Sequence, residues 1–185
     1  HAGYIQQQAD NFCDDARRFG ATGVVLNLEA PWSAAIGHRW AGVLRDQFGN
    51  KPARKSQLRK RCIEMINSVK QQIPDRIVAV STFPIPSSHA LPFEAMALHA
   101  DEIWPQVYFR GMGYQAKIRK SVTQWTKLGA HKLYYSGPGW LGPTKQRAMS
   151  FALRSELTPD AQIDWWVADK MDVDDLESAA ALAQE

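Results

Sequence analysis

The sequence has few cysteines, no long apolar run and no glycine-rich phosphate loop, and each absence removes a class of protein. The two cysteines, Cys13 and Cys62, fall on the apolar side of predicted helices, so we expect packing rather than metal or redox roles. No apolar run approaches the ~20 residues that cross a bilayer, so no membrane span is predicted. No predicted strand is followed by a G-x-G-x-x-G loop, which argues against a dinucleotide site, and no cofactor is predicted.

The composition is that of a single packed unit. The chain has 185 residues, 45% of them hydrophobic, which is enough for one core, and 22% charged residues with 10% aromatics exclude disordered and coiled-coil classes. We therefore predict one domain over 1–185, with a modest net charge of +3. One basic stretch is interpreted as the solvated start of a helix rather than a nucleic-acid patch; it contains Lys51, Arg54, Lys55, Arg59, Lys60 and Arg61.

Helical and strand-like patterns alternate strictly along the chain. The first strand pattern contains Val24, Val25 and Leu26, which we expect to be buried, and Pro105 is awkward inside the third. This order favours an α/β fold with a parallel sheet and right-handed crossovers. The predicted helices cover 4–19, 55–73, 92–99, 115–128, 144–156 and 172–184, and the predicted strands cover 23–29, 76–82, 102–108, 132–136 and 163–169.

Two architectures fit this alternation. One is an open doubly wound sheet, and the other is part of a (β/α)8 barrel. Five strands are too few for a whole barrel, which typically takes about 250 residues. The order of the strands in the sheet distinguishes the two architectures.

Polar and aromatic residues gather at the predicted carboxyl ends of the strands, where α/β enzymes hold their sites. The first strand ends in Asn27 and Glu29, which are two residues apart and so point the same way. Amides and phenols bind sugar hydroxyls, aromatic faces stack on pyranose rings, and a carboxyl group among aromatics becomes a general acid. The other strand ends carry Ser81, Thr82, Gln106, Tyr108, Ser136, Trp140, Trp165, Trp166 and Asp169.

Short segments at these ends resemble chitinase-type glycoside hydrolases. The segment F-G-A-T-G-V-V-L-N-L-E at 19–29 is similar to their strand-four signature D-G-x-D-x-D-x-E, which ends in the catalytic glutamate. W-P-Q-V-Y-F at 104–109 resembles their strand six, and I-D-W-W-V-A-D at 163–169 resembles their strand eight. A closer resemblance, over nearly the whole chain, is to bacterial and phage-associated glycosidases of this barrel type with L-N-L-E-A, S-T-F-P, P-Q-V-Y and S-G-P-G segments.

The resemblance implies that the chain supplies strands four to eight of a (β/α)8 TIM-like barrel. An N-terminal barrel segment, or other chains of an assembly, would then supply the rest. Glu29 matches the general acid, Tyr108 the site tyrosine, and Trp165 or Trp166 the sugar-stacking floor. Asn27 stands where these enzymes carry an aspartate that orients the substrate's N-acetyl group, and it resembles the Asn-x-Glu pair of endo-β-N-acetylglucosaminidases.

The predicted site contains catalytic residues and substrate contacts but no metal ligands. The lone histidines His89 and His99 have no second ligand at a suitable spacing. Asp169 is the predicted second carboxylate, although it also suits the cap of the last helix, whereas Asp164 is discounted because it starts its strand, as do Asp101 and Glu102. The predicted catalytic residues are Glu29, Asn27 and Asp169, and the predicted substrate contacts are Trp32, Gln106, Tyr108, Arg110, Trp140, Trp165 and Trp166.

The sequence leaves two main functions open. The first is a glycoside hydrolase that cleaves an N-acetylhexosamine polysaccharide of the peptidoglycan or chitin type. The alternative is an inactive glycan-binding or structural barrel module in a virion or envelope assembly, which the loss of the signature aspartates favours. An open-sheet enzyme of another class is a third reading. For the first two, a secreted, envelope or virion location is expected.

Overall fold

Strands and helices alternate along the chain, which confirms the α/β fold predicted from the sequence. The computed structural model describes residues 2–28, 55–108, 113–138, 142–157, 163–166 and 173–182. Its elements are α1 (Ala2–Arg18), β1 (Gly23–Asn27), α4 (Lys55–Gln72), β2 (Ile77–Thr82), the 3-10 turn η1 (Pro86–Ser88), α5 (Phe93–His99), β3 (Glu102–Pro105), α6 (Tyr114–Lys127), β4 (Tyr135–Pro138), α7 (Pro143–Glu156), β5 (Ile163–Trp166) and α8 (Val173–Leu182).

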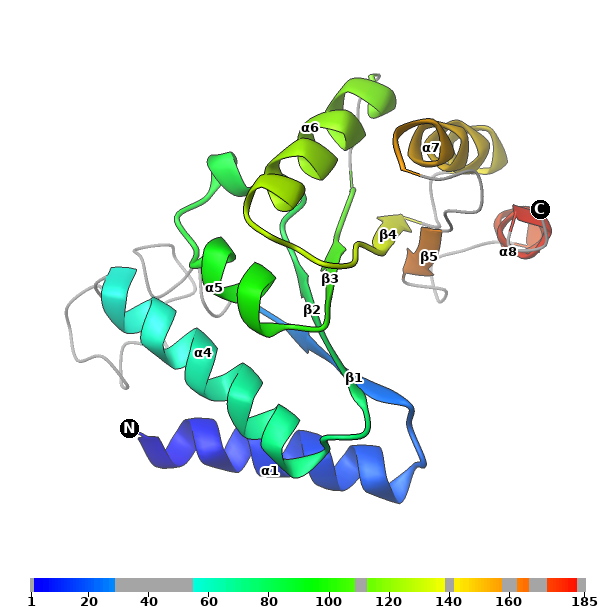
Figure 1. The fold of residues 1–185 in the computed structure, drawn as a ribbon. Coiled ribbons are helices and arrows are strands. Elements are labelled where there is room, and N and C mark those ends of the chain that lie inside the picture. The colour runs from blue at the N-terminus through cyan, green and yellow to red at the C-terminus, as the bar shows by residue number, and fades with distance from the viewer. Residues whose placement is uncertain are drawn as a thin grey trace.

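The described strands are parallel, and neighbours in space are neighbours in sequence. β1, β2 and β3 form one hydrogen-bonded sheet in that order, and β4 pairs with β5. Two isolated parallel bridges, Ile103 with Leu133 and Gln106 with Ser136, join β3 to β4. The order from β1 to β5 therefore does not reverse anywhere among the described strands (Figure 1).

A proline explains why the ladder between β3 and β4 is broken. The Ile103 amide donates to the Lys132 carbonyl at 2.9 Å, and the Val107 amide donates to the Ser136 carbonyl at 2.8 Å. Pro105 lies midway between these two donors and has no N–H to offer. Pro105 thus determines where the sheet is interrupted between β3 and β4, and we call this interruption the seam. On its other side β3 still pairs with β2, with Pro105 in register with Thr82.

The helices cover one face of the sheet. In β1, Val24 and Leu26 face this helical layer and are buried with residues of α1 and α4. Val25 points to the opposite face and is 42% exposed, so the prediction that all three residues are buried was wrong for it. We call this opposite face the open face, because no described helix lies over it (Figure 1).

Two apolar clusters lie between the sheet and the helices. The larger joins α1, α4 and α5 to β1 and β2, and the smaller joins α6 and α7 to β4. Leu133 is half-buried and packs against both clusters. The two clusters lie on either side of the β3–β4 seam.

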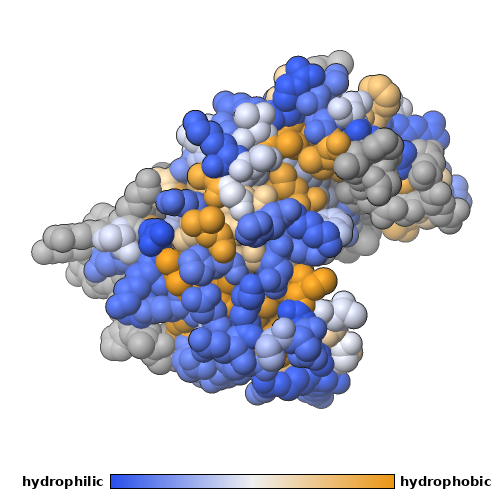
Figure 2. All heavy atoms as spheres, in the orientation of Figure 1, coloured by the Kyte–Doolittle hydropathy of each residue, from blue (hydrophilic) through white to orange (hydrophobic). Residues whose placement is uncertain are grey.

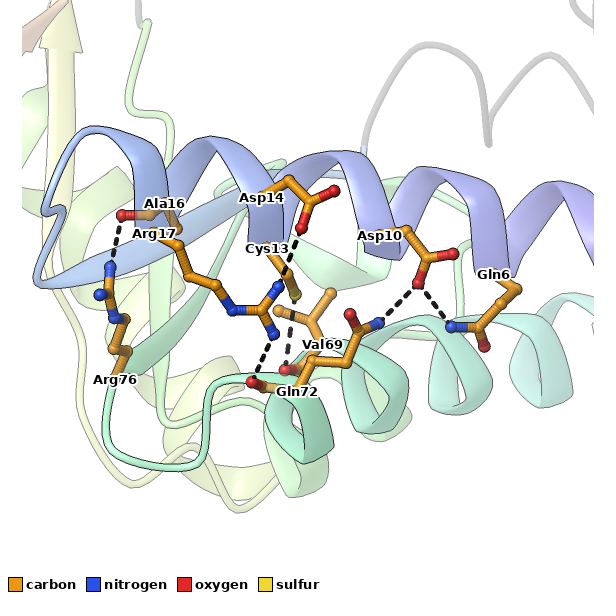
Figure 3. Close-up of polar contacts among 9 residues, drawn as sticks. All are labelled: Gln6, Asp10, Cys13, Asp14, Ala16, Arg17, Val69, Gln72 and Arg76. Atoms are coloured by element: carbon orange, nitrogen blue, oxygen red, sulfur yellow. Dashed lines mark hydrogen bonds and ion pairs between the residues drawn. The ribbon is translucent and has the colours of Figure 1, made fainter.

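The first helix is held to the sheet by polar contacts as well as by apolar packing (Figure 3). Arg76, just before β2, donates to the Ala16 and Ala21 carbonyls at the end of α1. Asp10 on α1 accepts hydrogen bonds from Gln6 and from Gln72 of α4. These contacts fix the path of the chain from α1 into β1.

The entry into β1 requires glycine for a steric reason. A Cβ atom on Gly23 would lie 2.6 Å from the Ile77 carbonyl oxygen of the paired strand. Such a contact is too short for any side chain, so the glycine permits the close approach of β1 to β2.

The surface view separates hydrophilic and apolar regions. In Figure 2, hydrophilic side chains cover the outer sides of α1 and α4, and apolar side chains show over α5 and the neighbouring strands. None of the described helices is both long enough and apolar enough to span a bilayer.

Candidate functional site

The open face brings together polar residues from the carboxyl halves of the strands. Asn27 of β1 is in register with Ser81 of β2, and Ser81 is in register with Trp104 of β3. Paired residues of parallel strands point to the same side, so these three side chains share the open face. Asn27 itself is exposed.

Gln106 lies on the same face as Trp104, two residues further along the chain, and it contacts Ser81. Its side-chain amide donates to the Ser81 hydroxyl at 2.9 Å, and its backbone amide donates to the Thr82 carbonyl at 2.9 Å. Both side chains are nearly inaccessible, at 7% for Gln106 and 6% for Ser81. A buried side-chain amide held in this way is fixed in place.

Asp164, which the sequence analysis discounted, lies on the same face. Gln106 forms a bridge with Ser136, and Ser136 is in register with Asp164 of β5. Asp164 is the second residue of β5 (Ile163–Trp166), so it starts its strand as the sequence predicts, but the register places it beside Ser136. Asp164 therefore lies level with the predicted site instead of at the far end of the sheet.

We call the resulting set the polar row. Each of the five described strands, or the residue just beyond its end, contributes one member. The members are Asn27, Ser81, Gln106, Ser136 and Asp164. Asn27, Ser81 and Gln106 lie at or near the carboxyl ends of their strands, the usual place for a ligand in α/β proteins, whereas Ser136 and Asp164 are the second residues of β4 and β5.

Asp164 is also the titratable member of the row, and its pKa is shifted. Burial raises the pKa of its carboxyl group above the ordinary value, and no described charged group contributes to this shift. The side chain nevertheless stays accessible to solvent. Partial desolvation disfavours the ionised carboxylate, which is the change that acid–base catalysts require.

An ion pair lies on the open face, nearer to the amino ends of the strands than the polar row. Glu102 is buried, and its carboxylate accepts hydrogen bonds from Lys132 at 2.9 Å and from the Trp104 indole at 3.0 Å. The Lys132 ammonium also lies 4.6 Å from the centre of the Tyr134 ring. Glu102 is thus a paired structural carboxylate, in agreement with its exclusion from the predicted site.

Trp104 and Tyr134 place aromatic rings on the open face beside these polar groups. Their ring centres are 5.9 Å apart, and neither residue is fully buried. Trp104 lies within the W-P-Q-V-Y-F segment but is not among the predicted site residues. Strand alternation alone, counted from Gln106, places Trp104 on the site's face.

Of the other predicted contacts, Trp165 lies away from the polar row. Trp165 is in register with Gly137 and packs against the apolar cluster of α6 and α7, which places it in the helical layer. Tyr108 follows the end of β3, where its backbone amide donates to the Gln106 carbonyl at 3.0 Å. Trp166 pairs with Pro138, but its side chain lies outside the described part of the structure.

Several predicted site residues lie outside the described residues. They include the predicted general acid and the first candidate for a second carboxylate. They are Glu29, Trp32, Arg110, Trp140 and Asp169.

Within the described ranges, no three or more His, Cys, Asp or Glu side chains are grouped so that they could hold a metal ion. His89 stacks on Phe83, with ring centres 3.7 Å apart and planes 7° apart. The His99 ring contacts the Asn67 side-chain oxygen at 3.2 Å. Both histidine rings therefore contact neighbouring side chains.

A cavity of about 640 Å³ opens in the helical layer, away from the polar row. It has an apolar floor that includes Phe93 and a rim that carries Arg59 and Lys127. None of its lining residues belongs to the polar row, so it is separate from the site at the strand ends.

In comparisons with known proteins, the chain matches no family model and no curated protein sequence. The geometry of the open face and the motifs in the sequence are therefore the basis for inferring a function.

Proposed function

We propose that this chain is part of a (β/α)8-type glycoside hydrolase and supplies strands four to eight of its barrel. The single observation that carries the proposal is the polar row, which five consecutive parallel strands build on one face. In a doubly wound sheet the strand order reverses and helices cover both faces. Here the order does not reverse among the described strands, and the described helices lie on one face, which favours the barrel.

The proposed substrate is an N-acetylhexosamine polysaccharide of the peptidoglycan or chitin type. Glu29 directly follows Leu28, whose backbone amide donates to the Ser81 carbonyl at 3.0 Å. In the proposal, the Glu29 carboxyl group protonates the leaving glycosidic oxygen. The Asn27 amide binds the acetamide group of the sugar, while Gln106 and Tyr108 position the ring.

Substitutions at the first strand test this proposal. In the full-length protein, we expect Glu29→Gln to abolish hydrolysis of the β-1,4-linked N-acetylglucosamine tetramer and of solubilised peptidoglycan, because the amide cannot donate the acid proton. Asn27→Ala should lower kcat/KM by about 10²–10³, the usual effect of removing one preorganised polar group. Asn11→Ala on the exposed side of α1 is the matched control and should leave kcat/KM unchanged. Undiminished hydrolysis by Glu29→Gln would refute the assignment.

A glycan-binding module without catalysis is the second candidate. Asn27 favours it, because an amide stabilises a developing positive charge less well than the aspartate of the resembled enzymes. Retention of the protein on insoluble chitin or peptidoglycan, together with no release of soluble sugar, would support this candidate over the hydrolase.

A further inference from the structure

We propose that the cavity in the helical layer is a second binding site, which takes a small anionic amphiphile: a molecule with an apolar body and one carboxylate head group. The cavity measures about 640 Å³, within the usual range for sites that hold small molecules. None of its lining residues belongs to the polar row, so this inference does not depend on the proposed glycosidase function.

A short helix leaves the space for this cavity. α5 has 7 residues, which span about 10 Å, whereas α4 and α6 have 18 and 14 residues. α5 lies between these two longer helices (Figure 1), and η1 lies in the chain that leads from β2 to α5. Residues of α4, η1, α5 and α6 all line the opening, so the cavity belongs to the packing of the helical layer.

The floor of the cavity is apolar and held in place. Leu91 and Phe93 line it, and both are buried. The Phe93 ring meets the fully buried Trp125 ring edge to face, with ring centres 5.5 Å apart. On one wall, the Ser87 backbone amide donates to the Gln124 side-chain oxygen at 2.9 Å, and the Gln124 side-chain amide donates to the Ser87 hydroxyl at 3.0 Å. Because these polar groups satisfy each other, the cavity offers a preformed apolar surface to a ligand.

The rim gives the cavity a preference for anions. Arg59 of α4 and Lys127 of α6 are exposed there, and neither forms an ion pair with another described residue. By contrast, Arg61 on α4 pairs with Glu64 at 2.6 Å. Glu94 is the only carboxylate among the described lining residues, so two cationic side chains face one anionic side chain. An apolar floor below such a rim fits a ligand with an apolar body and one anionic head group.

Titration calorimetry of the full-length protein with decanoate, below its critical micelle concentration, tests this inference. We expect saturable binding, and decyltrimethylammonium, which has the same chain and the opposite charge, should bind at least 10-fold more weakly. Affinity should rise by up to about fourfold per added methylene from hexanoate to octanoate to decanoate, because the floor buries the chain. Equal affinity for the two decyl probes, or no saturable binding of decanoate, overturns the inference.

Variants of the rim locate the site. The double variant Arg59→Gln/Lys127→Gln should weaken decanoate binding by about 10-fold, since each exposed cation contributes a modest attraction. Glu94→Gln should tighten binding by about 2-fold, because it removes the carboxylate that repels the head group. The matched control is Lys60→Gln/Lys120→Gln, which removes two exposed cations from the same two helices outside the cavity lining and should leave the affinity unchanged. If the two double variants lose affinity equally, net charge attracts the probe and the inference fails.

Two further measurements complete the test. Urea unfolding should give the wild-type midpoint for both double variants, because all four substituted side chains are exposed, so a loss of binding is not a loss of folding. Sedimentation with phosphatidylglycerol vesicles distinguishes a free carboxylate from an anionic lipid surface. We expect the protein to stay in the supernatant, and sedimentation with the vesicles without binding of decanoate would overturn the proposal.

Discussion

At the scale of single residues, burial determines the chemistry of the cysteines. Cys62 is fully buried, and this raises the pKa of its thiol from 9.0 to about 12. The thiol therefore stays protonated at neutral pH, which suits the packing role predicted from the sequence and not a redox role. Because the unfolded chain ionises at lower pH, Cys62 contributes stability below about pH 9 that is lost as the pH rises towards 12.

This linkage can be measured with Cys62→Ala. At neutral pH we expect the variant to lose about 1 kcal/mol of unfolding free energy, for the lost packing. Between pH 9 and 11, the wild type should lose up to about 1.4 kcal/mol per pH unit more than the variant, since one proton is linked to unfolding. Urea unfolding at pH 7, 9, 10 and 11 provides the comparison. Parallel pH dependences for the two proteins would show that the thiol does not titrate with unfolding.

The sequence predicts which types of residue lie at the strand ends, but it does not predict which of these residues lie side by side in the sheet. Asn27, Gln106 and Ser136 lie together as expected, because a buried run followed by polar residues marks the end of a parallel strand. Asp164 was missed because register depends on which residues pair across strands. The predicted strand ended at 169, three residues beyond the last residue of β5, Trp166, so Asp164 was expected further from the strand end.

At the scale of elements, Arg76 has the largest expected effect on the α1–β1 connection. Its guanidinium donates to two carbonyls where α1 ends and the chain turns into β1. Arg76→Met should cost about 2–3 kcal/mol in urea unfolding, because hydrogen bonds from charged donors are worth more than those from neutral donors. Lys60→Met is the control, since Lys60 is exposed and its pair with Glu64 spans 3.8 Å. Equal small losses in both variants would contradict this role.

The kind and order of the elements were predictable, whereas their edges depended on tertiary contacts. Helices α4, α5 and α6 lie within one or two residues of their predicted bounds, since their apolar periodicity is strong. β4 begins at Tyr135 instead of 132, because Pro105 interrupts pairing on the preceding strand. The burial of Val25 was mispredicted because an unbroken apolar run does not show which face the helices cover.

At the scale of the whole molecule, the open face carries apolar side chains that the described helices do not cover. Ile77 of β2 is 43% exposed there. If the full-length protein closes a barrel, this side chain lies in its interior. Ile77→Lys should then cost at least about 2 kcal/mol, because an unpaired charge would be buried.

Leu176 on α8 provides a matched control, since it is 45% exposed but lies in the helical layer. Leu176→Lys should change the urea midpoint of the full-length protein little. If Ile77→Lys is tolerated equally well, the open face meets solvent in the full-length protein, and the barrel proposal fails.

The missing hydrogen bond at Pro105 has a dynamic consequence. It leaves a three-stranded piece and a two-stranded piece, each with its own apolar cluster, and such pieces can open as separate cooperative units. The polar row crosses this boundary, since Gln106 contacts Ser81 on one side and forms a bridge with Ser136 on the other. A sugar chain that contacts both pieces would therefore hold them together. Its binding should slow amide hydrogen exchange in the two-stranded piece.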